Sequence, residues 1–334
     1  MPQNAALTKR ERLEKTFAGE PTDRAPVSLW RHWPGDDQRP GDLVAATVAF
    51  QRQYDWDFVK FTPASSFCIT DFGVQDRWVG NLEGTREYTK HAVSRSLDWT
   101  ELRVLDPTKG ALARQVEAVG LLKSALGDEA PILQTIFSPL AQAKNISGEA
   151  TLLTHMRTDP NRLITGLNTI TESILRFLDA LRRSGLSGIF YAVQHASYAL
   201  MSEEEYRTFG RPYDLRILQA LNRDWWFNML HLHGDAPMFD LVTDYPVQSL
   251  NWHDRETDPD LATGKRKFRG AVCGGLGHWD SVHNGTPAEV RAQARDAFEK
   301  TDGKRFILST GCVAMITSPS SNLRAVRDVV DGTA

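Results

Sequence analysis

The sequence of 334 residues contains only three cysteines, Cys68, Cys273 and Cys312, and they lie far apart along the chain. Three scattered cysteines do not form the dense disulfide framework that staples small secreted domains. We therefore expect a reducing, cytoplasmic setting, in which Cys312 is free to bind a metal ion.

Long apolar stretches and an excess of basic residues are also missing. No run of about 18 apolar residues occurs, so we expect no membrane span. Residues 1–20 are polar and charged and lack the apolar core of a secretory signal. The net charge of −3 gives no reason to expect nucleic acid or an acidic membrane surface as a partner.

The chain instead alternates short apolar segments with longer segments of helical periodicity. An amphipathic N-terminal helix is predicted over residues 7–20. The eight segments predicted as strands are 25–30, 58–63, 131–137, 188–193, 226–233, 248–252, 270–275 and 305–310. The predicted helices between them cover residues 42–54, 111–126, 160–184, 202–223 and 286–300.

Strands that alternate with helices are typical of parallel βαβ units. Eight such units favour an α/β fold of the closed (β/α)8 TIM-barrel type, as a single domain over residues 1–334. An open, doubly wound sheet is the alternative. Residues 67–105 are polar and aromatic and break the alternation, and we interpret them as an insertion over the barrel mouth.

The C-terminal ends of the predicted strands carry the candidate metal ligands, and barrels of this type place their chemistry at those ends. His231 and His233 share one face of a strand, because side chains two residues apart point the same way. Cys312 follows the last predicted strand. Imidazole and thiolate are ligands that zinc favours, and three protein ligands leave one position open. His231, His233 and Cys312 are therefore the predicted metal site.

Polar residues at other strand ends are the candidate catalytic groups. Arg31 can bind a carboxylate or phosphate with two hydrogen bonds, or it can form a surface ion pair. Gln194 and His195 can orient the substrate or belong to a hydrogen-bond network.

Four aromatic residues, Trp30, Trp33, Phe67 and Trp252, are candidates for the wall of a substrate pocket, with core packing as the alternative. The pair His253-Asp254 fits either an acid–base pair or a solvated loop.

Three stretches resemble the uroporphyrinogen decarboxylase superfamily. They are TKRERLEKTFAGEPTDRAPV, RRSGLSGIFYAVQHASYALMSEEEYRTFGRPYDLRILQAL, and GTPAEVRAQARDAFEK followed by RFILSTGC. The resemblance extends over most of the chain and implies the same (β/α)8 barrel. The decarboxylases carry two arginines in an M-R-Q-A-G-R pattern. Arg31 matches the first of these arginines, and the second has no counterpart here. Their catalytic aspartate is replaced within residues 60–63. These losses imply that a substrate with many carboxylates is held poorly.

The chain is more similar to the zinc methyltransferases of corrinoid-dependent pathways, which carry H-x-C on strand five and G-C on strand eight. His231 and His233 match H-x-C with His in place of Cys, and Gly311-Cys312 matches G-C. The resemblance implies a zinc-dependent, methyltransferase-like enzyme with a small-molecule substrate and a corrinoid as co-substrate. It also suggests a corrinoid protein as partner and a homodimer. Two alternatives stay open: a metal-free decarboxylase of a tetrapyrrole or another carboxylate, and a non-catalytic corrinoid- or porphyrin-binding protein.

Overall fold

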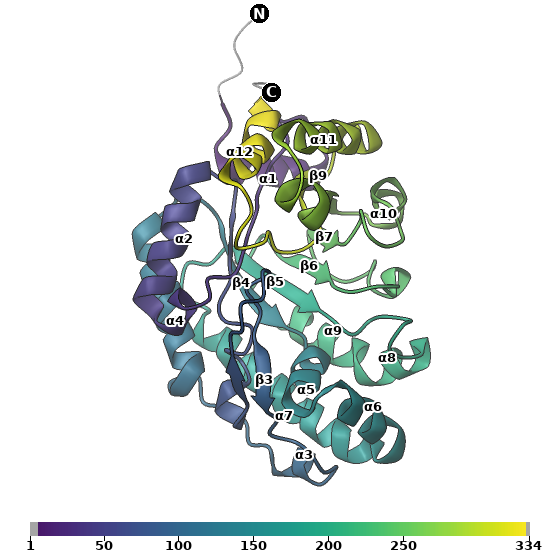
Figure 1. Cartoon of the computed structure of the whole chain (residues 1–334). Helices are drawn as coiled ribbons and strands as arrows, with labels where there is room; N and C mark the ends of the chain where they lie inside the picture. Colours follow the sequence, from purple (N-terminus) through teal and green to yellow (C-terminus); the bar gives the residue numbers. More distant parts are fainter. Residues whose placement is uncertain (1–5, 332–334) are drawn as a thin grey trace, which may run out of the picture.

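A computed structural model describes residues 6–331, and its central element is a curled sheet of seven parallel strands with helices on its outer side (Figure 1). The strands follow the order β1-β4-β5-β6-β7-β8-β9. They are β1 (Val59–Phe61), β4 (Ile132–Phe137), β5 (Gly188–Val193), β6 (Met229–Leu232), β7 (Ser249–Trp252), β8 (Ala271–Leu276) and β9 (Phe306–Thr310).

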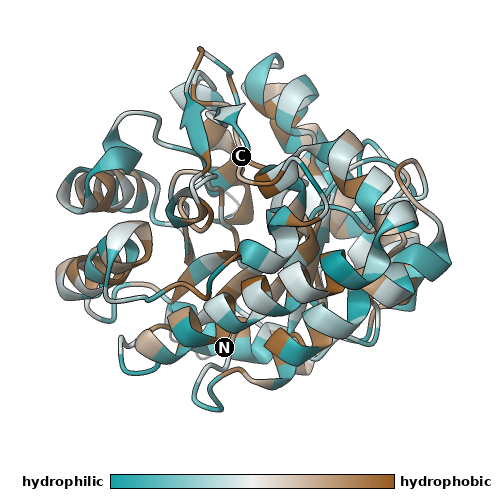
Figure 2. Cartoon of the chain, turned by 90° about the horizontal axis from the view of Figure 1, so that it is seen from below, coloured by the Kyte–Doolittle hydropathy of each residue, from teal (hydrophilic) through white to brown (hydrophobic). Residues whose placement is uncertain are grey.

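Amphipathic helices cover the outer side of the sheet, and Figure 2 shows their apolar residues turned mainly inward and their polar residues outward. The helices are α1 (Lys9–Ala18), α2 (Pro40–Tyr54), α3 (Asp98–Glu101), α4 (Gly110–Leu126), α5 (Pro139–Ser147), α6 (Glu149–Thr158), α7 (Pro160–Ala180), α8 (Glu203–Phe209), α9 (Arg211–Gln219), α10 (Leu261–Lys267), α11 (Pro287–Thr301) and α12 (Ser320–Asp328). Shorter helical turns are η1 (Asp36–Gln38), η2 (Thr70–Phe72), η3 (Phe239–Leu241), η4 (His278–His283) and η5 (Val329–Asp331).

Seven of the eight predicted strands are present in the sheet, and every residue of these seven is buried. Parallel strands that are buried on both faces have continuous apolar sequences, because helices cover the sheet. These apolar segments were therefore predicted correctly as strands. The strand order follows the chain without a reversal. A doubly wound sheet reverses its order at a switch point, so this alternative is wrong.

The first predicted strand, residues 25–30, forms only an isolated parallel bridge, from Val27 to Leu308. The backbone of this segment nevertheless forms hydrogen bonds on both sides, to β9 and to the residues before β1. Leu308 N–H donates to the Pro26 carbonyl on one side, and Asp57 N–H donates to the Val27 carbonyl on the other. Residues 25–30 therefore lie between β9 and the segment that leads into β1.

The predicted helix over residues 202–223 is divided into α8 and α9 at Gly210. Pro212 lies in the first turn of α9, where its missing N–H costs nothing. Pro212 also has no N–H to donate to the Thr208 carbonyl four residues earlier, so one continuous helix cannot run through this point.

The region predicted as an insertion contains an antiparallel hairpin of β2 (Gln75–Arg77) and β3 (Glu87–Lys90). The hairpin loop bonds to the segment after β9, where Ile316 N–H donates to the Leu82 carbonyl. That this region is an insertion on a single-domain barrel stays a prediction. Within residues 6–331, none of the helices combines the length and apolar character needed to span a bilayer.

Candidate metal centre

Four side chains from the C-terminal ends of β6, β7 and β9 bring their donor atoms together: His231, His233, His253 and Cys312. One donor atom from each lies within 4.8 Å of the donor atoms of all the others. The Nδ1 atom of His233 is 3.2 Å from His253 Nε2 and 3.7 Å from Cys312 Sγ. The structure thus brings together the three predicted ligands and adds His253 as a fourth.

Strand register explains why these side chains meet. His231 on β6 is the pairing partner of Asn251 on β7. His233 and His253 each follow two residues later, so they point in the same direction as the residues before them. The two strands therefore present a pair of facing polar side chains twice in succession.

His231 has a fixed orientation because its ring is hydrogen-bonded to Asn251. His231 Nδ1 lies 2.6 Å from Asn251 Oδ1. The Asn251 amide nitrogen already donates to the carbonyls of Cys273 and Thr310. Its oxygen must then accept, so His231 carries its proton on Nδ1 and has a free lone pair on Nε2.

His253 is oriented in the same way by a carboxylate. Its Nδ1 atom lies 3.0 Å from Glu256 Oε2, and the other Glu256 oxygen lies 2.8 Å from His278 Nδ1. A carboxylate can only accept here, which leaves His253 Nε2 to face His233 and Cys312. Burial lowers the pKa of His253, but Cys312 and Glu256 outweigh burial and raise this pKa to about 10.

Cys312 is surrounded by the three imidazole rings. Burial raises the pKa of its thiol, but interactions with His231, His233 and His253 outweigh burial and bring this pKa well below its usual value. The thiolate is the form that binds metals. Burial has the opposite effect on His231, whose pKa it lowers to about 4, so this ring stays neutral as a metal ligand requires.

The donor set fits a zinc ion. Zinc–nitrogen and zinc–sulfur bonds of about 2.0 and about 2.3 Å at tetrahedral angles separate two nitrogens by about 3.3 Å, and a nitrogen from a sulfur by about 3.6 Å. The distances of 3.2 Å and 3.7 Å at His233 Nδ1 agree with these values.

A cavity of about 260 Å³ lies against these donors at the C-terminal ends of the strands. Apolar and aromatic side chains form part of its wall, and the β2–β3 region contributes polar ones. Its lining includes Trp30, Lys60, Glu83, Tyr88, Phe137, Lys144, Phe190, Gln194, His231, His233 and Cys312. Lys60 is buried in this wall, and burial lowers its pKa to about 7.

Of the predicted catalytic residues, only Gln194 lines this cavity. His195 is buried behind it, 3.9 Å from Glu149, and neither of its ring nitrogens has a hydrogen-bond partner within residues 6–331. Arg31 stacks on Trp33 at 4.1 Å and donates to the Ile316 carbonyl, outside the cavity lining. Their catalytic roles stay predictions.

Three of the four predicted aromatic residues, Trp33, Phe67 and Trp252, lie outside the lining of this cavity. Trp33 is covered by the Arg31 guanidinium. Phe67 packs on the outer side of Phe137, at a ring distance of 6.4 Å. Trp252 is completely buried, and its indole donates to the Pro259 carbonyl. Of the four predicted aromatic residues, Trp30 lines the cavity, and Phe190 joins it there without having been predicted.

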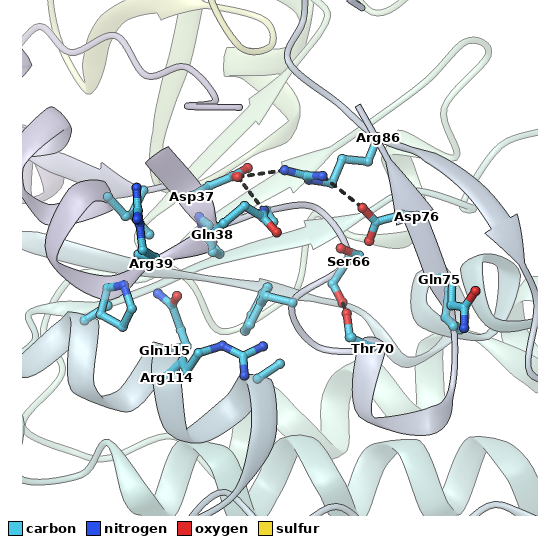
Figure 3. Close-up of a pocket in the computed structure, with 18 of the residues that line it drawn as sticks. Asp37, Gln38, Arg39, Ser66, Thr70, Gln75, Asp76, Arg86, Arg114 and Gln115 are labelled. Atoms are coloured by element: carbon cyan, nitrogen blue, oxygen red, sulfur yellow. Dashed lines mark hydrogen bonds and ion pairs between the residues drawn. The ribbon is translucent and has the colours of Figure 1, made fainter. Parts of the chain in front are cut away.

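A second cavity of about 430 Å³ lies beside the first and shares Arg86 with it. Figure 3 shows Arg86 between Asp37 and Asp76, with Arg114 and Gln115 of α4 on the opposite side. Arg86 donates to Asp37 at 2.9 Å and to Asp76 at 3.1 Å. Neither His nor Cys lines this cavity, so the metal donors belong to the smaller one.

Sequence reasoning missed two residues at the site, His253 and Lys60. The spacing Asn251-x-His253 repeats that of His231-x-His233 and was the available signal for His253. Lys60 offered no such pattern, because a single lysine at the end of a strand is usually exposed.

Comparisons with known proteins show which families the chain resembles. A methylcobamide:CoM methyltransferase, MtbA of Methanosarcina mazei, is 22% identical over 336 residues, covering 95% of this chain and 96% of the relative. A uroporphyrinogen decarboxylase of Prochlorococcus marinus is 24% identical over 235 residues, covering 67% of this chain and 64% of the relative.

A solved structure, a methyltransferase from Methanosarcina mazei, matches the fold with a TM-score of 0.85. It is 19% identical, and the match covers 98% of this chain and 99% of that one. The sequence model of the uroporphyrinogen decarboxylase (URO-D) family matches residues 8–333. The chain therefore belongs to the uroporphyrinogen decarboxylase family.

Proposed function

We propose that this chain is a zinc-dependent, methyltransferase-like enzyme that uses a corrinoid as co-substrate. The observation that carries the proposal is the mutual approach of four donor atoms, from His231, His233, His253 and Cys312, within 4.8 Å. The full-length similarity to methylcobamide:CoM methyltransferases supports the corrinoid. We further propose that residues 25–30 complete an eight-stranded barrel around this site, on the basis of their bonds to β9 and to Asp57.

A zinc ion held by these donors would lower the pKa of a bound thiol or water and so supply a nucleophile. The chain itself prepares the donors. Asn251 accepts the Nδ1 proton of His231, which leaves the Nε2 lone pair of this ring available. Glu256 accepts from His253 Nδ1, and the raised pKa of His253 means that its Nε2 also carries a proton, which metal binding would displace. The imidazoles around Cys312 lower the pKa of its thiol and so favour the thiolate.

The proton that leaves a binding thiol needs an acceptor. Glu83 is the carboxylate that lines the cavity, and burial together with Cys312 raises the pKa of Glu83. A carboxylate with a raised pKa is a better proton acceptor than an ordinary one. We assign Glu83 this role.

The cavity volume of about 260 Å³ favours a small acceptor. Pockets for drug-sized ligands measure about 300–1,000 Å³, so a tetrapyrrole with its side chains does not fit inside. A corrinoid would approach from the mouth of the cavity, where the hairpin loop exposes Trp78, Val79 and Leu82. This size favours methyl transfer over decarboxylation of a tetrapyrrole.

Metal analysis of untagged protein tests the proposal. We expect about one zinc per chain by mass spectrometry, and a loss of most of it in Cys312→Ser and His253→Ala. Cys68→Ser is the matched control, because Cys68 is also buried but lies outside the donor group. Wild-type protein without zinc, or a Cys312→Ser variant with undiminished zinc, would contradict the proposal.

Catalysis is tested separately with zinc-loaded protein, methylcobalamin and a panel of thiols. We expect thiol-dependent loss of the methylcobalamin absorbance, and at least a hundredfold slower loss with Cys312→Ser. Equal rates for the two proteins would rule out methyl transfer at this site.

A further inference from the structure

Lys60 is a buried cation in the wall of the metal-site cavity. Its side chain comes from β1, and the residue is 8% exposed. The ammonium nitrogen lies 4.8 Å from the centre of the Phe190 ring. Across residues 6–331, no carboxylate forms an ion pair with this ammonium and no hydrogen bond from it is present; the acidic group that acts on it is Cys312 of the donor cluster.

Among residues 6–331, Arg12 is the other buried lysine or arginine, and unlike Lys60 it has carboxylate partners. Arg12 is 5% exposed and pairs with both Asp23 and Asp57, at 2.6 Å and 2.7 Å. Removing an ammonium from water without a counter-charge costs several kcal/mol. The fold provides carboxylates for Arg12 and none for Lys60, and the Cys312 thiolate would be neutralised by a bound metal ion, so a direct anionic partner for Lys60 is expected to come from outside the protein.

The charge of the cavity supports the same conclusion. Three neutral imidazoles and one thiolate leave a bound divalent zinc with a net charge of about +1. Lys60 and Lys144 add further positive charge to the lining, Arg86 is already paired with Asp37 and Asp76, and Glu83 supplies one negative charge. The metal-loaded cavity therefore has an excess of positive charge that an anionic ligand would neutralise.

The cavity wall also indicates what carries the anion. Trp30, Phe137, Phe190 and Tyr88 all line it, and aromatic walls favour a planar, apolar body. Phe190 contacts Lys60 on one side of the site and stacks on His231 at 5.3 Å. A ligand over this ring can reach the ammonium and the metal donors together.

We propose that the substrate is a small aromatic acid whose carboxylate pairs with Lys60 while its reacting heteroatom lies at the metal donors. A carboxylate matches the single charge of Lys60, whereas a phosphate would require more donors than one ammonium offers. The placement of the heteroatom rests on the proposed function, and the role of Lys60 as carboxylate partner does not.

Calorimetric titration with matched ligand pairs tests the proposal. The first pair is 3-mercaptobenzoate and 3-mercaptobenzyl alcohol on zinc-loaded protein, and the second is benzoate and benzyl alcohol on metal-free protein. We expect wild type to bind the acid of each pair at least tenfold more tightly than the alcohol. Lys60→Met should reduce this preference to less than threefold, with unchanged zinc content and binding of the alcohols.

Lys144→Met is the control variant, because Lys144 lines the same cavity but is only half-buried. It should keep at least a fivefold preference for the acids. No preference in wild type, or an unchanged preference in Lys60→Met, overturns the proposal. A third outcome separates the two proposals. If the protein takes up no zinc but metal-free wild type still prefers benzoate and Lys60→Met does not, Lys60 is the carboxylate partner and the metal site is rejected.

Discussion

Hydrogen bonds behind the metal donors decide how the individual residues of the site behave. A neutral imidazole has one donor nitrogen and one acceptor nitrogen, and only the acceptor can bind a metal. Asn251 and Glu256 each fix that choice by accepting from Nδ1. Neither residue is a ligand of the proposed zinc, yet both determine which atom faces it.

Glu256 provides a test of this positioning. We expect Glu256→Ala to weaken zinc binding about 10- to 100-fold, because His253 loses the acceptor that fixes its ring. Competition with a chromophoric chelator measures the affinity. Glu299→Ala, an exposed glutamate on α11, is the control and should bind zinc as wild type does. Equal affinities in the two variants would show that Glu256 does not position the ligand.

At the residue scale the sequence predicted three of the four donors. His231 and His233 were recognisable because their spacing places both on one face of a single strand. The neighbouring His253 lay in a segment that fitted either an acid–base pair or a solvated loop. Its part in the cluster depends on the register between β6 and β7, which no local pattern expresses.

At the scale of elements, a buried carboxylate joins α9 to the elements around it. Asp214 accepts hydrogen bonds from Tyr191 of β5, Tyr206 of α8 and Tyr245. Burial raises the pKa of Asp214 to about 6, although the three hydroxyl groups lower it. The folded protein therefore holds a proton here that the unfolded chain releases at lower pH.

This network predicts a pH dependence of stability. The folded-state pKa lies above the unfolded value of about 3.9, so the folded state binds more protons between these two pH values. The free energy of unfolding should then fall by on the order of 3 kcal/mol as pH rises from about 4 to about 6. Urea unfolding across this range measures the change.

Asp214→Asn is the variant that isolates this contribution, because an amide does not titrate. Its unfolding free energy should change less with pH than that of wild type over the same range. Parallel curves for the two proteins would mean that Asp214 keeps an ordinary pKa in the folded state.

Element boundaries were predicted well where helices and strands have clear terminal signals. α11 begins with Thr286 as N-cap, Glu289 in a capping box and Pro287 in the first turn, and the predicted start was correct. The break at Gly210 was missed, because apolar periodicity continues through α8 and α9 and hides the effect of Pro212.

At the scale of the whole molecule, Asp57 holds together segments that are distant in sequence. It is completely buried and accepts from Arg12 of α1, from Arg24 and from the Val27 N–H. These bonds hold the N-terminal helix and residues 25–30 against the segment that leads into β1.

We expect Asp57→Asn to lower the free energy of unfolding by about 3–5 kcal/mol, since it removes the buried negative charge that the buried Arg12 and the partly buried Arg24 share. Asp55→Asn is the control. Asp55 forms an ion pair with Lys9 at the surface, and its substitution should lower the free energy of unfolding by about 1 kcal/mol or less. Thermal and urea unfolding measure both variants. A similar small loss in both would show that Asp57 does not anchor the N-terminal segments.

The sequence by itself determined the α/β alternation and seven of the strands, and it predicted His231, His233 and Cys312 as ligands, because periodicity and spacing are local properties of the chain. The tertiary structure decided which strand ends meet. It placed His253 beside these three residues and enclosed Lys60 without a carboxylate partner. The physical reason is that proximity and burial depend on strand register and on residues more than a hundred positions away, so they are properties of the assembled sheet.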